Sequence, residues 1–136
     1  MQTKQELENW YEQEDPWDYT ITEDDIYRKH FYLTVLEDLD GTYERALDIG
    51  AGEGFITKDL PAKEIHAIEL SDTAAKRLPE NVKRVSTPIG KYDLVLVTGL
   101  LQTPSFPCIA VDSPSLGPAK CVTPGKAMTT KTVSYT

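Results

Sequence analysis

A short glycine-rich segment, RALDIGAGEGF over residues 45–55, constrains the fold of this chain more than any other part of it. It is an apolar run, interrupted by Asp48, that leads directly into Gly50, Gly52 and Gly54. A strand that ends in such a loop is typical of Rossmann-like domains, in which the loop backbone approaches a nucleotide. The segment therefore predicts an α/β fold with a ligand site where its first strand ends.

The sequence around this loop alternates short apolar runs with short helical patterns. Strands are predicted over 46–49, 65–70, 82–85 and 94–97, and helices over 22–39, 55–60 and 72–78. Strands separated by helices of this length pair in parallel through right-handed crossovers, and the helices cover the sheet. The last of these strands, LVLV, is apolar on both faces, as expected of a central strand.

The link between the third and fourth strands is unusually short. Only about six residues separate Val85 from Tyr92, and crossing three strand spacings takes about 14 Å before the chain returns along the sheet. The link can close only if the third strand is short.

Composition divides the chain into three regions. They are an acidic, aromatic-rich arm over 1–21, an α/β domain over 22–101 that holds the glycine loop, and a Pro/Ser/Thr-rich segment over 102–136. A chain of 136 residues is expected to form one domain. The last segment holds five of the nine prolines, and we predict it to be mostly irregular, with strand candidates only at CIAV and TVSY.

Charge and hydropathy exclude several classes of partner. The net charge is -8, and an acidic protein is poorly suited to nucleic acid, which needs clustered Lys and Arg. No apolar run reaches about 18 residues, so we expect no membrane span. The first residues are polar and acidic rather than signal-like, which favours a cytoplasmic protein. Cys108 and Cys121 lack the spacing of a zinc site, so no metal is predicted.

The glycine loop departs from the dinucleotide fingerprint G-x-G-x-x-G, because Phe55 stands where the third glycine belongs. Asp48 and Glu53 also make the loop acidic, which disfavours a pyrophosphate at this position. A ligand with cationic centres and no phosphate fits better, and S-adenosylmethionine carries a sulfonium and an ammonium. Glu69 lies nineteen positions after Gly50, near the spacing at which an acid reaches a ribose.

These residues resemble a known family. LDIGAGEGF is similar to motif I of the class I S-adenosylmethionine-dependent methyltransferases, and the similarity extends from about Asp15 to Leu101. The segment DPWDY, followed by a helix, resembles the nodulation-type N-methyltransferase branch. The resemblance implies a Rossmann-like class I methyltransferase fold. Such folds normally have seven strands, whereas we expect only about four to five here, with a truncated or altered C-terminal half.

The resemblance also implies a role for each cofactor residue. Asp48 would lie near the methionine ammonium, directly or through water, and Glu69 would hold the ribose hydroxyls. Backbone at the glycine loop would approach the cofactor, and Thr98 to Leu100 would line its methionyl side. The cofactor-binding set is therefore Asp48, Gly50, Ala51, Gly52, Glu69, Thr98 and Gly99.

Three functions are compatible with these features. The first is an S-adenosylmethionine-dependent methyltransferase that acts on a small molecule, such as an amine. The second is a catalytically impaired S-adenosylmethionine-binding module that lacks the acceptor half, and the third, disfavoured by the loop, is an NAD-binding domain.

The catalytic residues stay unassigned at the sequence level. General-base candidates are Asp15, Tyr19, Asp24 and His30, and nothing in the sequence selects among them. An open sheet edge could be covered by a second copy of the chain, so a homodimer is one expected assembly.

Overall fold

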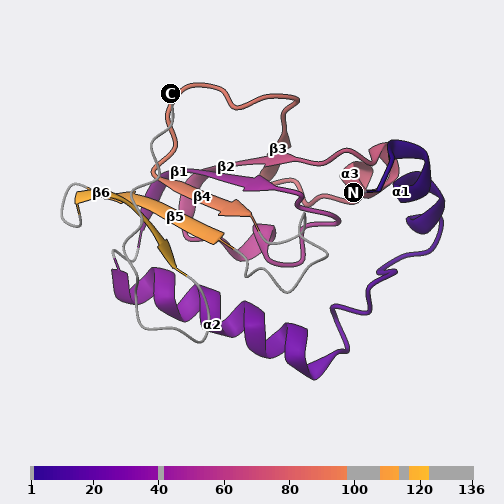
Figure 1. Ribbon diagram of the computed structural model, residues 1–136, viewed down its shortest axis with the longest axis horizontal. Helices are drawn as coiled ribbons and strands as arrows, with labels where there is room; N and C mark the ends of the chain where they lie inside the picture. Colours follow the sequence, from indigo (N-terminus) through magenta and orange to yellow (C-terminus); the bar gives the residue numbers. More distant parts are fainter. Residues whose placement is uncertain (1, 40–41, 98–107, 114–116, 123–136) are drawn as a thin grey trace.

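The structure is a computed structural model that describes residues 2–39, 42–97, 108–113 and 117–122. Its centre is a six-stranded sheet with the strand order β3-β2-β1-β4-β5-β6 (Figure 1). The strands are β1 (Tyr43–Ile49), β2 (Ala62–Ile68), β3 (Val82–Arg84), β4 (Leu94–Val97), β5 (Cys108–Ser113) and β6 (Gly117–Val122). The helices are α1 (Lys4–Trp10), α2 (Glu23–Leu39), α3 (Asp72–Lys76) and a single 3-10 turn, η1 (Thr57–Asp59).

The first four strands form the predicted parallel sheet. Strand β1 pairs in parallel with β2 on one side and β4 on the other, and β3 pairs in parallel with β2. The order 3-2-1-4 places the change of winding direction between β1 and β4, and ligands bind at the carboxyl ends of the strands at such a point. The third strand has only three residues, which is how the short link to β4 closes.

The region after residue 101 contains more regular structure than predicted. The CIAV segment is confirmed as a strand, because it lies within β5. The prediction that residues 117–122 are irregular was wrong. They form β6, which pairs antiparallel with β5. The described sheet therefore has one strand more than the upper end of the predicted range. The TVSY candidate lies outside the described residues.

The N-terminal arm also holds a helix that was not predicted. The Thr3 hydroxyl accepts a hydrogen bond from the Glu6 amide, and the Glu6 carboxylate accepts one from the Thr3 amide, so a capping box starts α1. The box signature is readable in the sequence, but a seven-residue helix is marginal by itself. Conversely, the predicted helix over 55–60 is reduced to η1.

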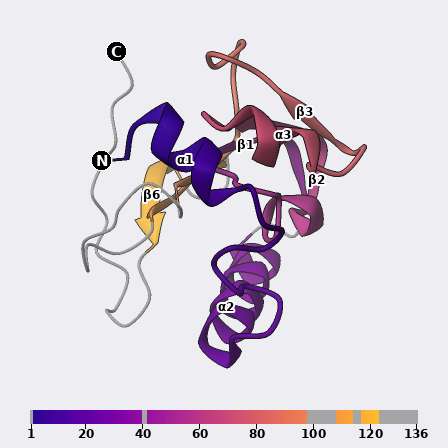
Figure 2. The same cartoon turned by 90° about the vertical axis from the view of Figure 1, so that its right-hand side faces the viewer.

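The main core lies between α2 and the sheet. Figures 1 and 2 show α2 along one side of the strands, while α1 and α3 lie next to each other away from it. Tyr32 and Leu36 of α2 are fully buried, and the hydroxyl of Tyr43 donates to the Leu36 carbonyl at 3.1 Å. The core also includes Ala46, Ile56, Leu60, Ile65, Ala67, Val82, Leu94 and Leu96. Among the described helices, none is both long and apolar enough to span a membrane.

A buried polar cluster fastens the β3–β4 link to the sheet. His66 of β2 is 1% exposed, and its ring nitrogens contact the Tyr92 hydroxyl and a Glu64 carboxylate oxygen, both at 2.7 Å. The same hydroxyl accepts a hydrogen bond from the Ile89 amide at 2.9 Å. Tyr92 therefore joins the sheet to the link that follows β3.

Replacing Tyr92 with phenylalanine should lower the free energy of unfolding by about 1–2 kcal/mol, because the His66 ring and the Ile89 amide each lose a partner. Urea unfolding followed by circular dichroism would measure the change. Tyr27→Phe is the matched control, since Tyr27 is 73% exposed on α2. Equal stabilities for the two variants would contradict the role given to Tyr92.

Candidate functional site

The two predicted cofactor acids lie at the carboxyl ends of neighbouring parallel strands. Asp48 is near the end of β1, and Glu69 directly follows β2. Glu69 is 8% exposed and accepts hydrogen bonds from the amides of Gly52, at 2.6 Å, and Ser71, at 2.9 Å. Glu69 therefore connects the end of β2 to the glycine loop, so the structure brings the two parts of the predicted site together.

Asp48 lies in the interior beneath the loop. It is 1% exposed, and its Oδ2 accepts a hydrogen bond from the Thr57 hydroxyl at 2.6 Å. Its Oδ1 is buried and has no hydrogen-bond partner among the described residues. Burial raises the pKa of Asp48 to about 7; the Thr57 hydrogen bond opposes the shift and the nearby Glu69 carboxylate adds to it. An unpaired buried carboxylate oxygen at a strand end is suited to a cationic ligand group.

The glycine loop has the backbone conformation that its sequence requires. Gly50 and Gly52 have φ of 78° and 59°, a region that side chains with a Cβ rarely adopt. A Cβ on Gly52 would lie 2.9 Å from the hydroxyl of Tyr11, a residue of the N-terminal arm. Ala51, between these glycines, is half-buried. The loop is thus built for close approach, and here the closest neighbour is Tyr11.

An open cavity of about 460 Å³ lies beside Glu69. Its lining comes from the ends of β2 and β3 and from α1: Lys4, Ile68, Glu69, Leu70, Arg84, Val85 and Ser86. Leu70 is half exposed, so the cavity combines an apolar surface with the Glu69 carboxylate. An apolar surface with a few polar groups is typical of small-molecule sites.

Glu53 has a different role from the one predicted. Its Oε1 accepts a hydrogen bond from the Asp15 amide at 2.9 Å and lies 3.3 Å from an Arg77 guanidinium nitrogen. The carboxylate is therefore paired within the protein, and the prediction that its charge helps to select the ligand of the loop is not supported. Among the described residues, Asp48 and Glu69 are the remaining predicted acids of the site.

A second cavity, of about 180 Å³, lies between the arm and the glycine loop. Trp17, Tyr19 and Phe55 are among its lining residues and form a row, with ring centroids 6.4 Å apart for the first pair and 5.7 Å for the second. Asp15 lines the same cavity, but its carboxylate accepts hydrogen bonds from the Tyr19 and Thr20 amides and the Thr20 hydroxyl. Asp15 thus shapes the turn rather than standing free as a base.

The other base candidates are distributed over two places. Tyr19 lines the same cavity, and burial raises its pKa, so it stays protonated at neutral pH. Asp24 and His30 are exposed on α2. The structure therefore does not gather the four candidates into one site.

Some predicted site residues lie outside the described part of the chain, and two residues near the glycine loop were not predicted from the sequence. Thr98 and Gly99, with Leu100, lie outside the described residues. Tyr11 and Arg77 were not predicted, and both contact the glycine loop region. Arg77 lies 24 positions from Glu53 and 66 from Tyr11, so these contacts are not local and no local pattern marks them.

Comparison with known proteins gives matches only among solved structures. Neither a protein-family model nor a curated protein sequence matches the chain. The N-methyltransferase NodS from Bradyrhizobium japonicum WM9, solved with S-adenosyl-L-homocysteine, aligns at 23% identity with a TM-score of 0.57, over 68% of this chain and 54% of that one. The fold is that of the class I methyltransferases.

A second similarity is more distant. The plantazolicin methyltransferase BpumL, also solved with S-adenosyl-L-homocysteine, aligns at 23% identity with a TM-score of 0.40, over 69% of this chain and 46% of that one. The chain thus spans about half the length of the structures it matches. The fold predicted from motif I is confirmed by the first of these matches.

Proposed function

We propose that this chain binds S-adenosylmethionine and transfers its methyl group to a small molecule. The observation that carries the proposal is the buried Asp48 carboxylate, whose Oδ1 has no partner among the described residues and which lies beside a loop held by Glu69. A ligand ammonium, or a water bound to it, would satisfy that oxygen. Gly50, Ala51 and Gly52 would then contact the methionine part through their backbone.

Glu69 is proposed to hold the ribose. Each of its oxygens accepts one backbone amide and keeps further acceptor capacity, so the carboxylate can take the two ribose hydroxyls without releasing the loop. The cavity lined by Leu70, Val85 and Ser86 would receive the adenine. The residues present therefore fit the cofactor at its ammonium, ribose and base.

The chemistry makes limited demands on the protein. Bound S-adenosylmethionine would supply an electrophilic methyl group on its sulfonium. The protein has to align the acceptor in line with the departing sulfur and exclude water, and no nucleophilic triad is needed. The similarity to an N-methyltransferase supports a nitrogen acceptor, so a small amine is the acceptor class that we propose.

A binding measurement tests the proposal directly. Isothermal titration calorimetry with S-adenosylmethionine, S-adenosylhomocysteine and NADH should give binding of the first two compounds and none of the third. Binding of NADH alone would establish the dinucleotide alternative and end the proposal.

A binding module without turnover is the second candidate. The alignment covers 54% of the NodS chain, so binding and turnover have to be measured separately for this chain. Incubation with methyl-labelled donor and an amine library separates the two candidates. Labelled product establishes the enzyme, and binding without product establishes the module.

A further inference from the structure

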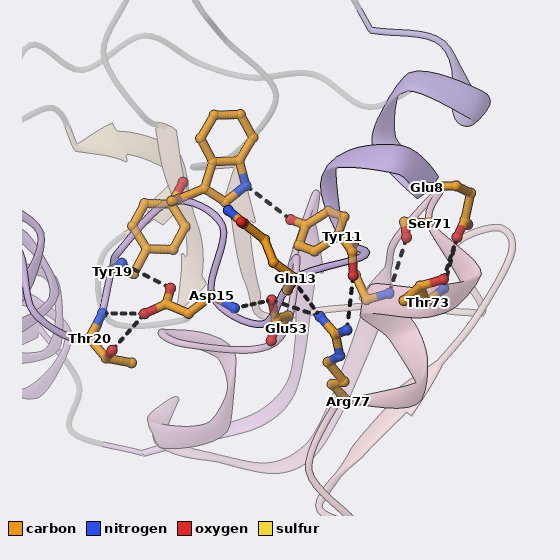
Figure 3. Close-up of polar contacts among 12 residues, drawn as sticks. Glu8, Tyr11, Gln13, Asp15, Tyr19, Thr20, Glu53, Ser71, Thr73 and Arg77 are labelled. Atoms are coloured by element: carbon orange, nitrogen blue, oxygen red, sulfur yellow. Dashed lines mark hydrogen bonds and ion pairs between the residues drawn. The ribbon is translucent and has the colours of Figure 1, made fainter.

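The N-terminal segment 3–20, here called the strap, runs along the edge of the sheet where the proposed cofactor residues lie. At its start, the Glu8 carboxylate accepts hydrogen bonds from the Asp72 and Thr73 amides and from the Thr73 hydroxyl, so it caps α3 from a distant part of the chain (Figure 3). Lys4 adds an ion pair to Asp72 at 2.9 Å. The first half of the strap is thereby joined to the helix that follows Glu69.

Arg77 holds the middle of the strap. Its guanidinium donates to the main-chain carbonyl of Tyr11 at 2.9 Å and to that of Gln13 at 3.0 Å, and it pairs with Glu53 of the glycine loop. Glu53 in turn accepts the Asp15 amide. Figure 3 shows these contacts converging on one guanidinium, which therefore connects strap, loop and α3.

The strap covers part of the proposed site. Tyr11 is 5% exposed, and its hydroxyl lies against Gly52 and accepts a hydrogen bond from the Trp17 indole at 3.2 Å. Gly52 and Asp48 are both buried in this arrangement. A ligand that has to reach the backbone of Gly52 can do so only when Tyr11 moves.

We propose that Arg77 is a positioning residue that latches the strap over the cofactor site, so that cofactor enters and leaves only when the latch opens. The identity of the ligand rests on the proposed function. The latch itself is inferred from the contacts of Arg77 and needs no ligand. Arg77 acts through Tyr11 and Glu53 and does not itself touch the reacting atoms.

The test measures the binding kinetics of S-adenosylhomocysteine to the 136-residue chain by stopped-flow fluorescence, with Trp10 and Trp17 as reporters. Arg77→Met should raise both the association and the dissociation rate by about tenfold, the change expected when a charge-assisted hydrogen bond that closes the strap is lost. Arg77→Lys keeps the charge but not the forked guanidinium that reaches two carbonyls. Its association and dissociation rates should lie between those of the original chain and those of Arg77→Met.

Arg45→Met is the matched control. Arg45 has the same exposed side-chain fraction of 26%, pairs with Glu64 and donates to the Lys91 carbonyl, all away from the strap. Its loss should leave both rates unchanged. A general loss of structure would raise dissociation without raising association, so an unchanged association rate in Arg77→Met, or equal effects of the two substitutions, would overturn the latch.

Hydrogen exchange separates failure of the latch from failure of the proposed function. If S-adenosylhomocysteine binds no variant, the proposed function fails, and the latch is judged by the Asp15 and Tyr19 amides, which are hydrogen-bonded in the strap. They should exchange faster in Arg77→Met than in Arg45→Met, while the β1 amides stay protected. Unchanged protection in Arg77→Met would refute the latch without reference to any ligand.

Discussion

Asp48→Asn is expected to weaken binding of S-adenosylhomocysteine by about a hundredfold or more, while making the unliganded protein more stable at pH 8. Loss of one partner from a buried charge pair typically costs about 2–5 kcal/mol, which lowers affinity by about 30-fold to a few thousandfold. Calorimetric titration of the two proteins at the same pH would measure the effect. The opposite signs follow from one fact: the carboxylate is buried without a partner for Oδ1 among the described residues.

The stability gain depends on pH in a direction set by the raised pKa. Burial lifts the pKa of Asp48 from 3.8 to about 7 in the folded protein, so folding favours the protonated form. The stabilisation is fully present below the unfolded pKa and is lost as the pH rises through the folded pKa, to a total of about 4 kcal/mol at most. Asparagine does not ionise, so the part of its advantage that comes from avoiding a buried charge should be near zero at pH 4 and largest above pH 7.

Buried asparagine has its own cost. Its unsatisfied amide offsets part of the gain, which leaves a net rise in the free energy of unfolding of about 2 kcal/mol at pH 8. Asp93→Asn is the matched control, because Asp93 accepts the Glu44 and Arg45 amides far from the loop. It should lower stability and leave affinity unaltered. If Asp48→Asn bound S-adenosylhomocysteine as tightly as the original chain, the role of Asp48 would be wrong.

Glu69→Gln should reduce both the stability of the fold and the affinity for S-adenosylhomocysteine. Each Glu69 oxygen accepts one amide hydrogen, from Gly52 or Ser71, whereas glutamine turns an NH2 group toward one of these donors. Leaving a buried amide unsatisfied costs about 1–3 kcal/mol. Urea unfolding measures the first effect, and calorimetry should show a loss of affinity of about tenfold or more.

A cofactor analogue that lacks both ribose hydroxyls shows whether Glu69 binds the ribose. The original chain should bind this analogue more weakly than S-adenosylhomocysteine, and Glu69→Gln should discriminate much less between the two compounds. Glu64→Gln, in β2 a few residues before Glu69 but half exposed, should behave like the original chain toward both compounds. Undiminished discrimination by Glu69→Gln would assign the ribose to another residue.

Several parts of the fold could be predicted because their causes are local. The positive φ at Gly50 and Gly52 requires glycine, and the apolar runs of β1 and β4 require burial, so both features are visible in a few consecutive residues. Glu69 was identified by its distance along the chain from the loop. The parallel pairing among the first four strands was predicted from the helical patterns that separate most of them in the sequence.

Other parts were decided only by contacts between distant residues. Glu53 looks like a free carboxylate of the loop, yet Arg77 and the Asp15 amide pair with it once α3 and the strap are in place. The antiparallel direction of β5 depends on pairing with β4 across the sheet and has no signature in its own composition.

The sequence by itself determined the strand that ends in a glycine loop, the acid inside it and the acid after the next strand, because backbone conformation and side-chain periodicity are properties of short segments. Only the tertiary structure decided which of the acids stays unpaired, since pairing depends on what folding brings beside each one. In the part of the chain that the structure describes, Asp48 Oδ1 is buried without a partner, Glu53 is paired with Arg77, and Tyr11 lies over Gly52.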